Sequence, residues 1–280
     1  SRGLNLSRAS LDAASKYPWG RDAAVIEEGG REKFGVYTDD REVFDWLRHG
    51  LPEREVSIEA QVMDLADDIA YSVHDFEDAI VGGYLRPAAL DQAGRDTIDD
   101  AGSGGWDGEQ FDPDRLERAL VQLSALSWWP DQFEATRLDF AGLKNLTSAL
   151  IGRFAQSVSL GQRVLPGSER EGLPERYRYV LVVPEDTRSE IALLKAMVAK
   201  AVMGHETRQP IYRHQRDILT SLLETMSADP LRYLEPMFAE DFNGAPSDGE
   251  KRRVIIDQVA SLTDQAAIAW HERMQAGAWG

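Results

Sequence analysis

The sequence predicts a mainly α-helical protein with one small antiparallel β-hairpin. Apolar residues recur at helical spacing through most of the chain, in segments that often follow cap-forming Asp or Pro residues. Residues 157–165 and 177–183 (SVSLGQRVL and YRYVLVV) instead alternate or run through β-branched residues, and a glycine-containing turn separates them. We therefore expect helices on both sides of a hairpin near residues 157–183.

Helical patterns occupy most of the chain. The segments are residues 4–17, 39–47, 56–80, 114–127, 140–158, 187–202, 212–226 and 251–274. Pro18 follows the first segment and ends it, because proline cannot continue a helix. Residues 20–35 are polar and contain glycine, which predicts an exposed excursion. Residues 91–113 are rich in Gly and Asp, which predicts a loop or mobile insert.

The composition limits the function. Hydrophobic residues make up 42% of the 280 residues, and no apolar run approaches the roughly 18 residues of a membrane span, so we expect a soluble protein. There is no cysteine, so a metal would be held by His, Asp, Glu or water, and a reducing cytoplasm fits. The net charge of −17 disfavours a nucleic-acid surface. A small phosphorylated substrate would need a local cationic pocket, a metal ion, or both.

The segment at residues 56–80 is the most informative. Apolar residues surround most of its helical circumference, which predicts a buried helix. Asp67, Tyr71 and Asp75 nevertheless recur at i, i+4 and i+8 and share one narrow stripe. Buried carboxylates need a cation or hydrogen-bond donors, so the stripe could hold a metal ion at one end and a polar ligand further along. It could equally be a solvated acidic face, and the pattern alone leaves both interpretations open.

Several ordered motifs resemble one family. ADDIAYSVHDFED (residues 66–78) resembles a signature of the HD-domain deoxyguanosinetriphosphate triphosphohydrolase-like family. Four further segments also resemble that family: GLNLSRASLDAASKYPW, KFGVYTDDREVFDWL, LTSALIGRF and SLTDQAAIAWHERM. The resemblance spans nearly the whole chain. It implies that the chain is the C-terminal portion of an HD-domain-type helical bundle.

The resemblance also implies roles for individual residues. In such proteins a metal ion is held by His, then His-Asp, then a distant Asp, and that last ligand corresponds to Asp67. Tyr71 then approaches the phosphate or sugar of the substrate, and Asp75 accepts a hydrogen bond from the sugar 3′-hydroxyl. Lys16 and Tyr17, in a KYP element, are candidate phosphate contacts.

One departure from the family pattern stands out. The one His-Asp dipeptide is His74-Asp75, which lies after the terminal Asp ligand. We expect the upstream His and His-Asp ligands and the general acid/base histidine to precede Ser1, in a missing N-terminal segment of the same protein. This chain alone is then expected to be inactive.

For the intact protein, the resemblance implies a metal-dependent hydrolase of deoxynucleoside triphosphates such as dGTP. Water would attack the α-phosphorus and release deoxynucleoside and triphosphate, with a divalent cation (Mg, Mn, Fe, Co, Ni or Zn) as cofactor. We expect a cytoplasmic homo-oligomer that contacts no membrane. The alternative is a non-catalytic helical module with a regulatory or oligomerisation role.

The resemblance divides the chain into three parts. Residues 1–90 would complete the catalytic core, residues 91–113 would form the insert, and residues 114–280 would form a helical C-terminal region with the hairpin. Arg153, in LIGRF, could point at a triphosphate or form a salt bridge.

Overall fold

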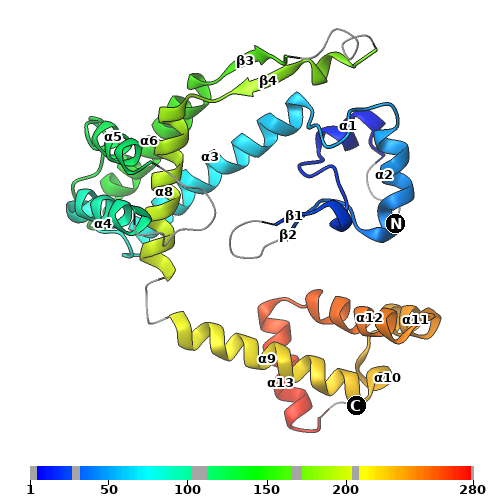
Figure 1. Cartoon of the computed structure of the whole chain (residues 1–280). Coiled ribbons are helices and arrows are strands. Elements are labelled where there is room, and N and C mark those ends of the chain that lie inside the picture. The colour runs from blue at the N-terminus through cyan, green and yellow to red at the C-terminus, as the bar shows by residue number, and fades with distance from the viewer. Residues whose placement is uncertain (1–4, 27–31, 103–111, 165–171, 204–207, 279–280) are drawn as a thin grey trace. The chain divides into compact units, whose positions relative to one another are not determined.

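The structure, a computed structural model, describes residues 5–26, 32–102, 112–164, 172–203 and 208–278 (Figure 1). Side chains are not described at residues 26, 101–102, 203 and 208–209. The chain forms two compact units, unit 1 (Ser1–Gly204) and unit 2 (His205–Gly280), and each is described by itself. Helices dominate both, so the prediction of a mainly α protein with a small antiparallel hairpin is confirmed.

Unit 1 contains most of the secondary structure. Its helices are α1 (Arg8–Ala13), α2 (Arg41–Arg48), α3 (Ile58–Val81), α4 (Leu90–Gly102), α5 (Pro113–Ser124), α6 (Arg137–Ser157) and α8 (Glu185–Met203). Short 3-10 turns are η1 (Arg21–Ala23), η2 (Thr38–Asp40), η3 (Pro87–Ala89) and η4 (Glu175–Tyr177). The strands are β1 (Val25–Ile26), β2 (Glu32–Lys33), β3 (Ser159–Gln162) and β4 (Tyr179–Val182).

The predicted hairpin is present. Strands β3 and β4 pair antiparallel, with Ser159 opposite Val182 and Gln162 opposite Tyr179, while residues 165–171 of the turn lie outside the described residues. A second, shorter ladder joins β1 and β2 within the segment for which the sequence predicts only an exposed excursion. Two residue pairs are too few to give a recognisable alternation, so the pattern carries no signal for this ladder.

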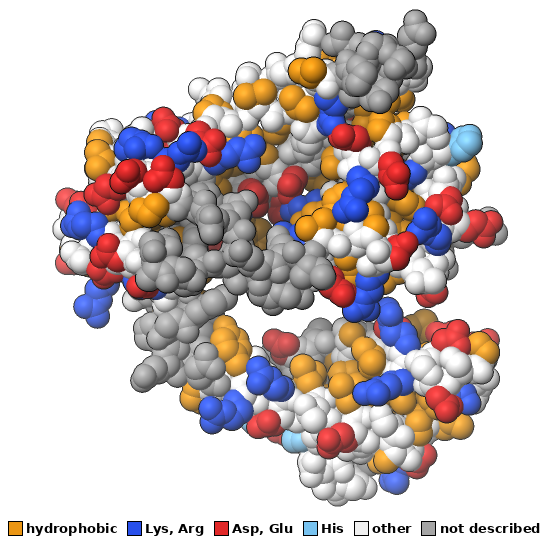
Figure 2. Space-filling view, viewed as in Figure 1, with side chains coloured by type: hydrophobic (Ala, Val, Ile, Leu, Met, Phe, Trp, Pro, Cys, Tyr) orange, Lys and Arg blue, Asp and Glu red, His pale blue; other side chains and the backbone are white. Residues whose placement is uncertain are grey.

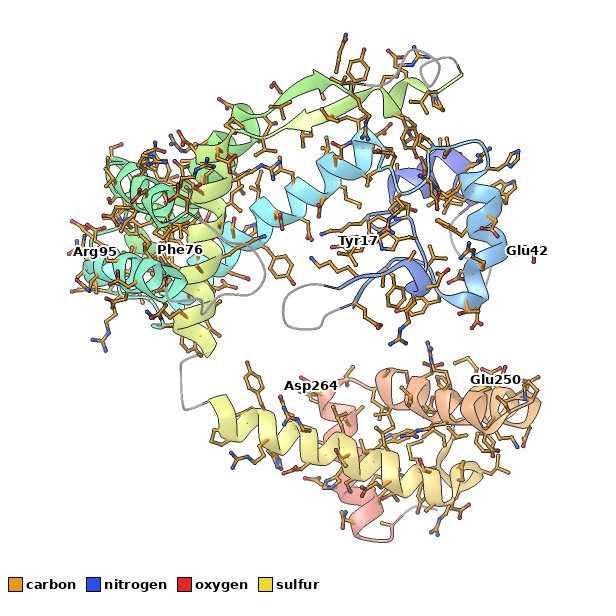
Figure 3. All side chains as sticks on the ribbon, in the orientation of Figure 1. Tyr17, Glu42, Phe76, Arg95, Glu250 and Asp264 are labelled. Carbon is orange, nitrogen blue, oxygen red and sulfur yellow. The ribbon has the colours of Figure 1, made fainter. Side chains whose placement is uncertain are left out.

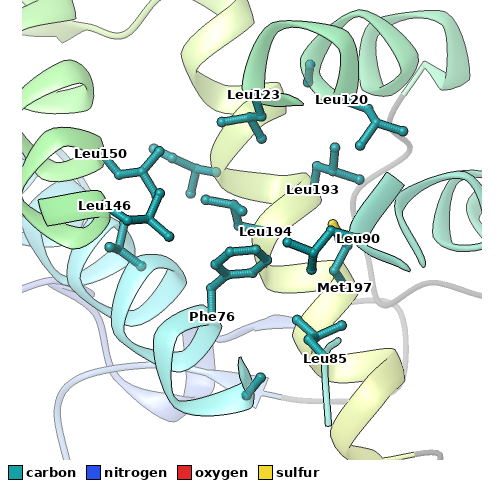
Figure 4. Packing of buried hydrophobic residues seen from close by; sticks show 14 of the residues in the cluster. Phe76, Leu85, Leu90, Leu120, Leu123, Leu146, Leu150, Leu193, Leu194 and Met197 are labelled. Atoms are coloured by element: carbon teal, nitrogen blue, oxygen red, sulfur yellow. The ribbon is translucent and has the colours of Figure 1, made fainter. Parts of the chain in front are cut away.

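The core of unit 1 lies between α3, α4, α5, α6 and α8. Figure 4 shows Phe76 pointing from α3 toward Leu194 of α8, with Leu90 and Met197 nearby, and all four side chains are buried. Burying an aliphatic or aromatic side chain of this size contributes about 1.5–3 kcal/mol. Helix α8 contacts α3, α4 and α5, so it holds this core together.

The prediction of a loop at residues 91–113 is wrong for the first half of this segment, because α4 extends from Leu90 to Gly102. Residues 103–111 lie outside the described part of the chain. Leu90 and Ile98 are buried in the core, and Gly94 lies against α5: a Cβ there would come within 2.5 Å of Leu120 Cδ1. Gly94 therefore allows α4 and α5 to approach closely.

The expected division after residue 90 also differs from the observed one. Helices α3 and α4 share a core with α8, so the compact boundary falls at Gly204 and His205 instead.

Unit 2 has a core of its own. Its helices are α9 (Arg208–Ala228), α10 (Pro230–Tyr233), α11 (Pro236–Gly244), α12 (Asp248–Ala260) and α13 (Asp264–Gln275). The prediction of a single helix at residues 251–274 is wrong, because α12 ends at Ala260 and α13 begins at Asp264, after three intervening residues. Thr263 caps α13 by accepting a hydrogen bond from the Ala266 amide at 3.3 Å, and Asp264 follows in the first turn. A capping threonine followed by an acid is a helix-start signal that apolar spacing alone conceals.

Within the described residues, no helix is long and apolar enough to cross a membrane.

Candidate functional site

Helix α3 carries the candidate site on one face and core residues on another. Ser57 begins the helix by accepting a hydrogen bond from the Ala60 amide at 3.3 Å. The buried face consists of Ile69, Val73, Phe76 and Ile80, which recur at helical spacing. The core therefore fixes the rotation of the helix, and with it the direction in which its other faces point.

The face that carries Asp67, Tyr71 and Asp75 is open. All three side chains are exposed, and Tyr71 retains 62% of its accessible surface. Met63, one turn before Asp67, is also exposed. The prediction of a helix buried on most sides is thus wrong for this face, because no described element of unit 1 packs over it.

Two of the three side chains do line a concavity. Tyr71 and Asp75 border a pocket of about 340 Å³ between α3 and α8. Asp68 and Ser72 complete the wall from α3, and the opposite wall is formed by Lys195, Val198, Ala199 and Val202 of α8. Asp67 is not among the lining residues. The pocket thus has a polar wall from α3 and a largely apolar wall from α8, the arrangement expected for a ligand with both kinds of surface.

The acids that flank this stripe are paired with lysines. Lys16 forms an ion pair with Asp64, and Lys195 Nζ lies 2.5 Å from Asp68 Oδ1. Burial opposes the charged form of Lys16, but the hydrogen bond and charge of Asp64 raise its pKa above the usual value. In contrast, Asp67, Tyr71 and Asp75 form no hydrogen bond or ion pair with the described residues through their side chains. Figure 2 shows acidic side chains in a hollow of unit 1 with cationic side chains beside them.

Tyr17 lies on the side of the N-terminal segment that faces α3, whereas Glu42 of α2 points away from it (Figure 3). The ammonium groups of Lys16 and Lys33 lie 5.6 and 5.7 Å from the centre of the Tyr17 ring. The ion pair to Asp64 therefore brings both residues of the KYP element next to the helix that carries the candidate site.

The pKa values of Asp75 and Glu77, near the C-terminal end of α3, are shifted in opposite directions. Burial, together with the charge of Asp78, raises the pKa of Asp75 above its usual value. Burial also opposes ionisation of Glu77, but hydrogen bonds from Lys144 and Thr147, at 2.7 and 2.6 Å, hold its pKa below the usual value. Glu77 is therefore a structural carboxylate that Lys144 neutralises, whereas no described lysine or arginine forms an ion pair with Asp75.

The described residues do not build a complete metal site. They contain no group of three or more His, Cys, Asp or Glu side chains arranged to hold a cation. Asp67 itself is exposed on α3, and no other described acid or histidine is grouped with it in this way.

Arg153 has a structural partner. Its guanidinium forms two hydrogen bonds with the carboxylate of Glu190, at 2.8 and 2.6 Å, and Glu190 is only 1% exposed. Of the two roles considered for Arg153, the salt bridge is the observed one. Lys195, by contrast, is a pocket residue that sequence reasoning missed, because a lysine in a helix carries no signal of its own until the partner of that helix is known.

Comparison with known proteins agrees with this helical architecture. Residues 181–273 match the model of the phosphohydrolase-associated domain. The match covers about a third of the chain and reaches from β4 to α13, so it includes α8 and nearly all of unit 2.

Several known proteins are similar to nearly the whole chain. The chain is 42% identical, over 98% of its length, to a deoxyguanosinetriphosphate triphosphohydrolase-like protein of Streptomyces coelicolor, and covers 64% of that protein. Proteins of the same name from Bifidobacterium longum and Corynebacterium glutamicum are 43% and 37% identical, over 97% and 94% of the chain, which covers 58% and 61% of them. The resemblance seen in its motifs is therefore confirmed: along nearly its whole length the chain is related to deoxyguanosinetriphosphate triphosphohydrolase-like proteins, and it spans about three fifths of their length.

Proposed function

We propose that this chain forms the substrate-binding part of a metal-dependent deoxynucleoside triphosphate triphosphohydrolase. The observation that carries the proposal is the contrast along α3. Asp64 and Asp68 are neutralised by lysines, while Asp67, Tyr71 and Asp75 have no partner among the described residues and two of them line a pocket. Side chains left without partners at a concavity are typical of groups that bind a ligand.

The proposed roles follow the length of the helix. Asp67 supplies one oxygen ligand to a divalent cation at the phosphate end. Asp75 accepts a hydrogen bond from the sugar 3′-hydroxyl, and Tyr71 contacts the substrate between them. Eight residues of α-helix span about 12 Å, which accommodates a sugar and its phosphates along the helix. Lys16 and Tyr17 contact the phosphates from the N-terminal segment, and the apolar wall of α8 covers the less polar part of the nucleoside.

The remaining parts of the enzyme come from outside this chain in the proposal. One carboxylate cannot hold a divalent cation, so the other ligands, including histidines, would be supplied by an N-terminal HD segment of the same protein. Hydrolysis to deoxynucleoside and triphosphate, a cytoplasmic location and a homo-oligomeric state belong to that longer protein and are part of the proposal.

The first experiment tests Asp67 in the longer protein. We expect Asp67→Asn to lower both bound metal and triphosphate release, because a neutral amide is a poorer ligand for a hard cation. Asp78→Asn is the matched control, since this acid is also exposed on α3 and has no role in the proposal. Wild-type metal content and activity in Asp67→Asn would refute the assignment.

A second variant separates substrate from metal. Asp75→Ala is expected to raise KM for dGTP and to leave the metal content unchanged, because the carboxylate binds the sugar in the proposal. A substrate that lacks the 3′-hydroxyl should then bind wild type and variant equally. Equal loss of both substrates would contradict the role of Asp75.

The rival function is a non-catalytic regulatory or oligomerisation module. The separate core of unit 2 supports this rival function, because a unit with its own core can serve as an independent interaction module. It predicts no tightly bound metal in the longer protein and no effect of Asp67→Asn. Mass spectrometry and light scattering of the purified protein would show whether an N-terminal fragment accompanies the chain and how many copies assemble.

A further inference from the structure

The pocket between α3 and α8 contains a cation to which the proposed function gives no role. Among the described residues that line it, Lys195 is the one lysine or arginine, and it lies opposite Tyr71 and Asp75. Its ammonium group contacts Asp68, the residue that directly follows the proposed metal ligand Asp67. A cation at this position lies at the end of the pocket where the phosphates would bind.

The charge of the pocket creates a problem that Lys195 can solve. The wall from α3 contributes two carboxylates, and the chain as a whole carries a net charge of −17. A triphosphate would be repelled from such a surface without a local positive charge. We propose that Lys195 binds a phosphate group of the substrate, and that Asp68 holds its ammonium group in position until the phosphate replaces it. This inference rests on the proposed function, because it assumes that the pocket receives a nucleoside triphosphate.

The existing ion pair is suited to such an exchange. The side chains of Lys195 and Asp68 retain 39% and 45% of their accessible surface, so water screens their attraction and separating them costs little. A phosphate oxygen offers a charge-assisted hydrogen bond at least as strong as that of the carboxylate. The ammonium group can therefore transfer from Asp68 to the ligand without a large net cost.

The position of Lys16 supports the same conclusion. Lys16 pairs with Asp64, four residues before Asp68, so the two lysines contact neighbouring positions on one face of α3. Side chains four residues apart on a helix are separated by about 6 Å. Two ammonium groups that pair with neighbouring positions of α3, one from the N-terminal segment and one from α8, can bind different phosphates of a single triphosphate.

A purely structural role for Lys195 makes different predictions. The contact between α3 and α8 is already made by buried side chains, among them Phe76 and Leu194, so loss of a screened ion pair should hardly alter stability. With a structural role, Lys195→Gln and Asp68→Asn would also change ligand affinity in the same way, because each removes one partner of the same ion pair. A binding role makes their effects opposite, since removing Asp68 frees the ammonium group for the phosphate.

The experiment is calorimetric titration of the chain, without metal and at low salt, with inorganic triphosphate and with dGTP. We expect Lys195→Gln to weaken binding of both about tenfold, the size of one charge-assisted hydrogen bond, and Asp68→Asn to tighten it. Lys200→Gln is the matched control: this residue lies on the same helix, has the same 39% exposed side chain and pairs with Asp100 at 2.7 Å, but does not line the pocket. The Lys200→Gln variant should bind inorganic triphosphate and dGTP with the affinity of the wild-type chain.

Several outcomes would overturn the proposal. These are no binding of triphosphate by the wild-type chain, equal affinities of Lys195→Gln and Lys200→Gln, or weaker binding by Asp68→Asn. Failure of the proposed function has a different signature. In that case Lys195→Gln would still weaken binding of inorganic triphosphate, but Asp75→Ala would leave the affinity for dGTP unchanged.

Discussion

Replacing Tyr177 with Phe would remove one hydroxyl from a buried polar junction that joins distant parts of unit 1. The hydroxyl donates to Asp12 Oδ2 at 2.6 Å and accepts a hydrogen bond from Arg48 Nη1, also at 2.6 Å. Asp12, on α1, is only 2% exposed, and Tyr177, on η4, is fully buried. Burial, together with the hydrogen bond to Asp12, raises the pKa of Tyr177, so it remains a donor at every physiological pH.

The expected cost is that of one hydrogen bond to a charged group, about 1.5–3 kcal/mol. The ring still fills its space, Asp12 loses one donor, and Arg48 Nη1 loses the hydroxyl but keeps Asp12 Oδ1 as an acceptor at 2.8 Å. Hydrogen exchange suits the measurement, since a protein with two units need not unfold in one step. Amides of α1 and α2 should exchange faster in Tyr177→Phe, and those of α12 in unit 2 should not change.

The control is Tyr179→Phe, which removes a hydroxyl two residues away. Tyr179 is partly exposed and its hydroxyl has no hydrogen-bond partner among the described residues, so hydrogen exchange should stay as in wild type. If the two variants exchange alike in α1, then the junction does not hold the N-terminal helices and the reasoning is refuted.

Three further predictions concern carboxylates and their partners. The pKa of Glu77 is lowered, so its stabilising contribution is present above the ordinary value of 4.5 and is lost as the pH falls through the lower folded value. Urea titrations should therefore show Glu77→Gln destabilised at neutral pH and approaching wild type under acid; a constant difference would be contrary evidence. The pKa of Asp75 is raised, so its ionisation opposes folding as the pH rises, and Asp75→Asn should melt no lower than wild type at neutral pH. A clearly lower melting temperature would show that this carboxylate has a stabilising partner. Arg153→Ala should cost about 3–5 kcal/mol because it leaves buried Glu190 unpaired, with Arg153→Lys recovering part of the loss; unchanged urea unfolding of the alanine variant would contradict this.

Local patterns predict the parts of the fold that depend on local geometry. The helix expected at residues 56–80 is observed as Ile58–Val81, because a long apolar periodicity and a serine cap both lie within the segment. The hairpin follows from two β-branched runs that are close in sequence. The error over the first half of residues 91–113 has a tertiary cause: the Gly- and Asp-rich composition predicts a loop, but the buried residue Ile98 shows that this part packs into the core as a helix.

The candidate site is predicted in part for the same reason. Helical spacing places Asp67, Tyr71 and Asp75 on one face, and the structure agrees with that common face. Their roles as ligands stay predictions. Lys195 and the apolar wall of the pocket could not be predicted, because they depend on which face of α8 packs against α3. The openness of the Asp67 face likewise depends on what packs over α3, and a single helix does not contain that information.

Helix α8 has a consequence for any attempt to dissect this protein. The segment matched to the phosphohydrolase-associated domain begins at residue 181 and so includes α8, whose Leu193, Leu194 and Met197 are buried in unit 1. A fragment that begins at the edge of that match would contain α8 without the helices that it packs against. The apolar face of α8 would then be exposed to water, and the fragment would tend to aggregate. Expression of unit 2 by itself is better started at His205, where the cut leaves both hydrophobic interiors whole.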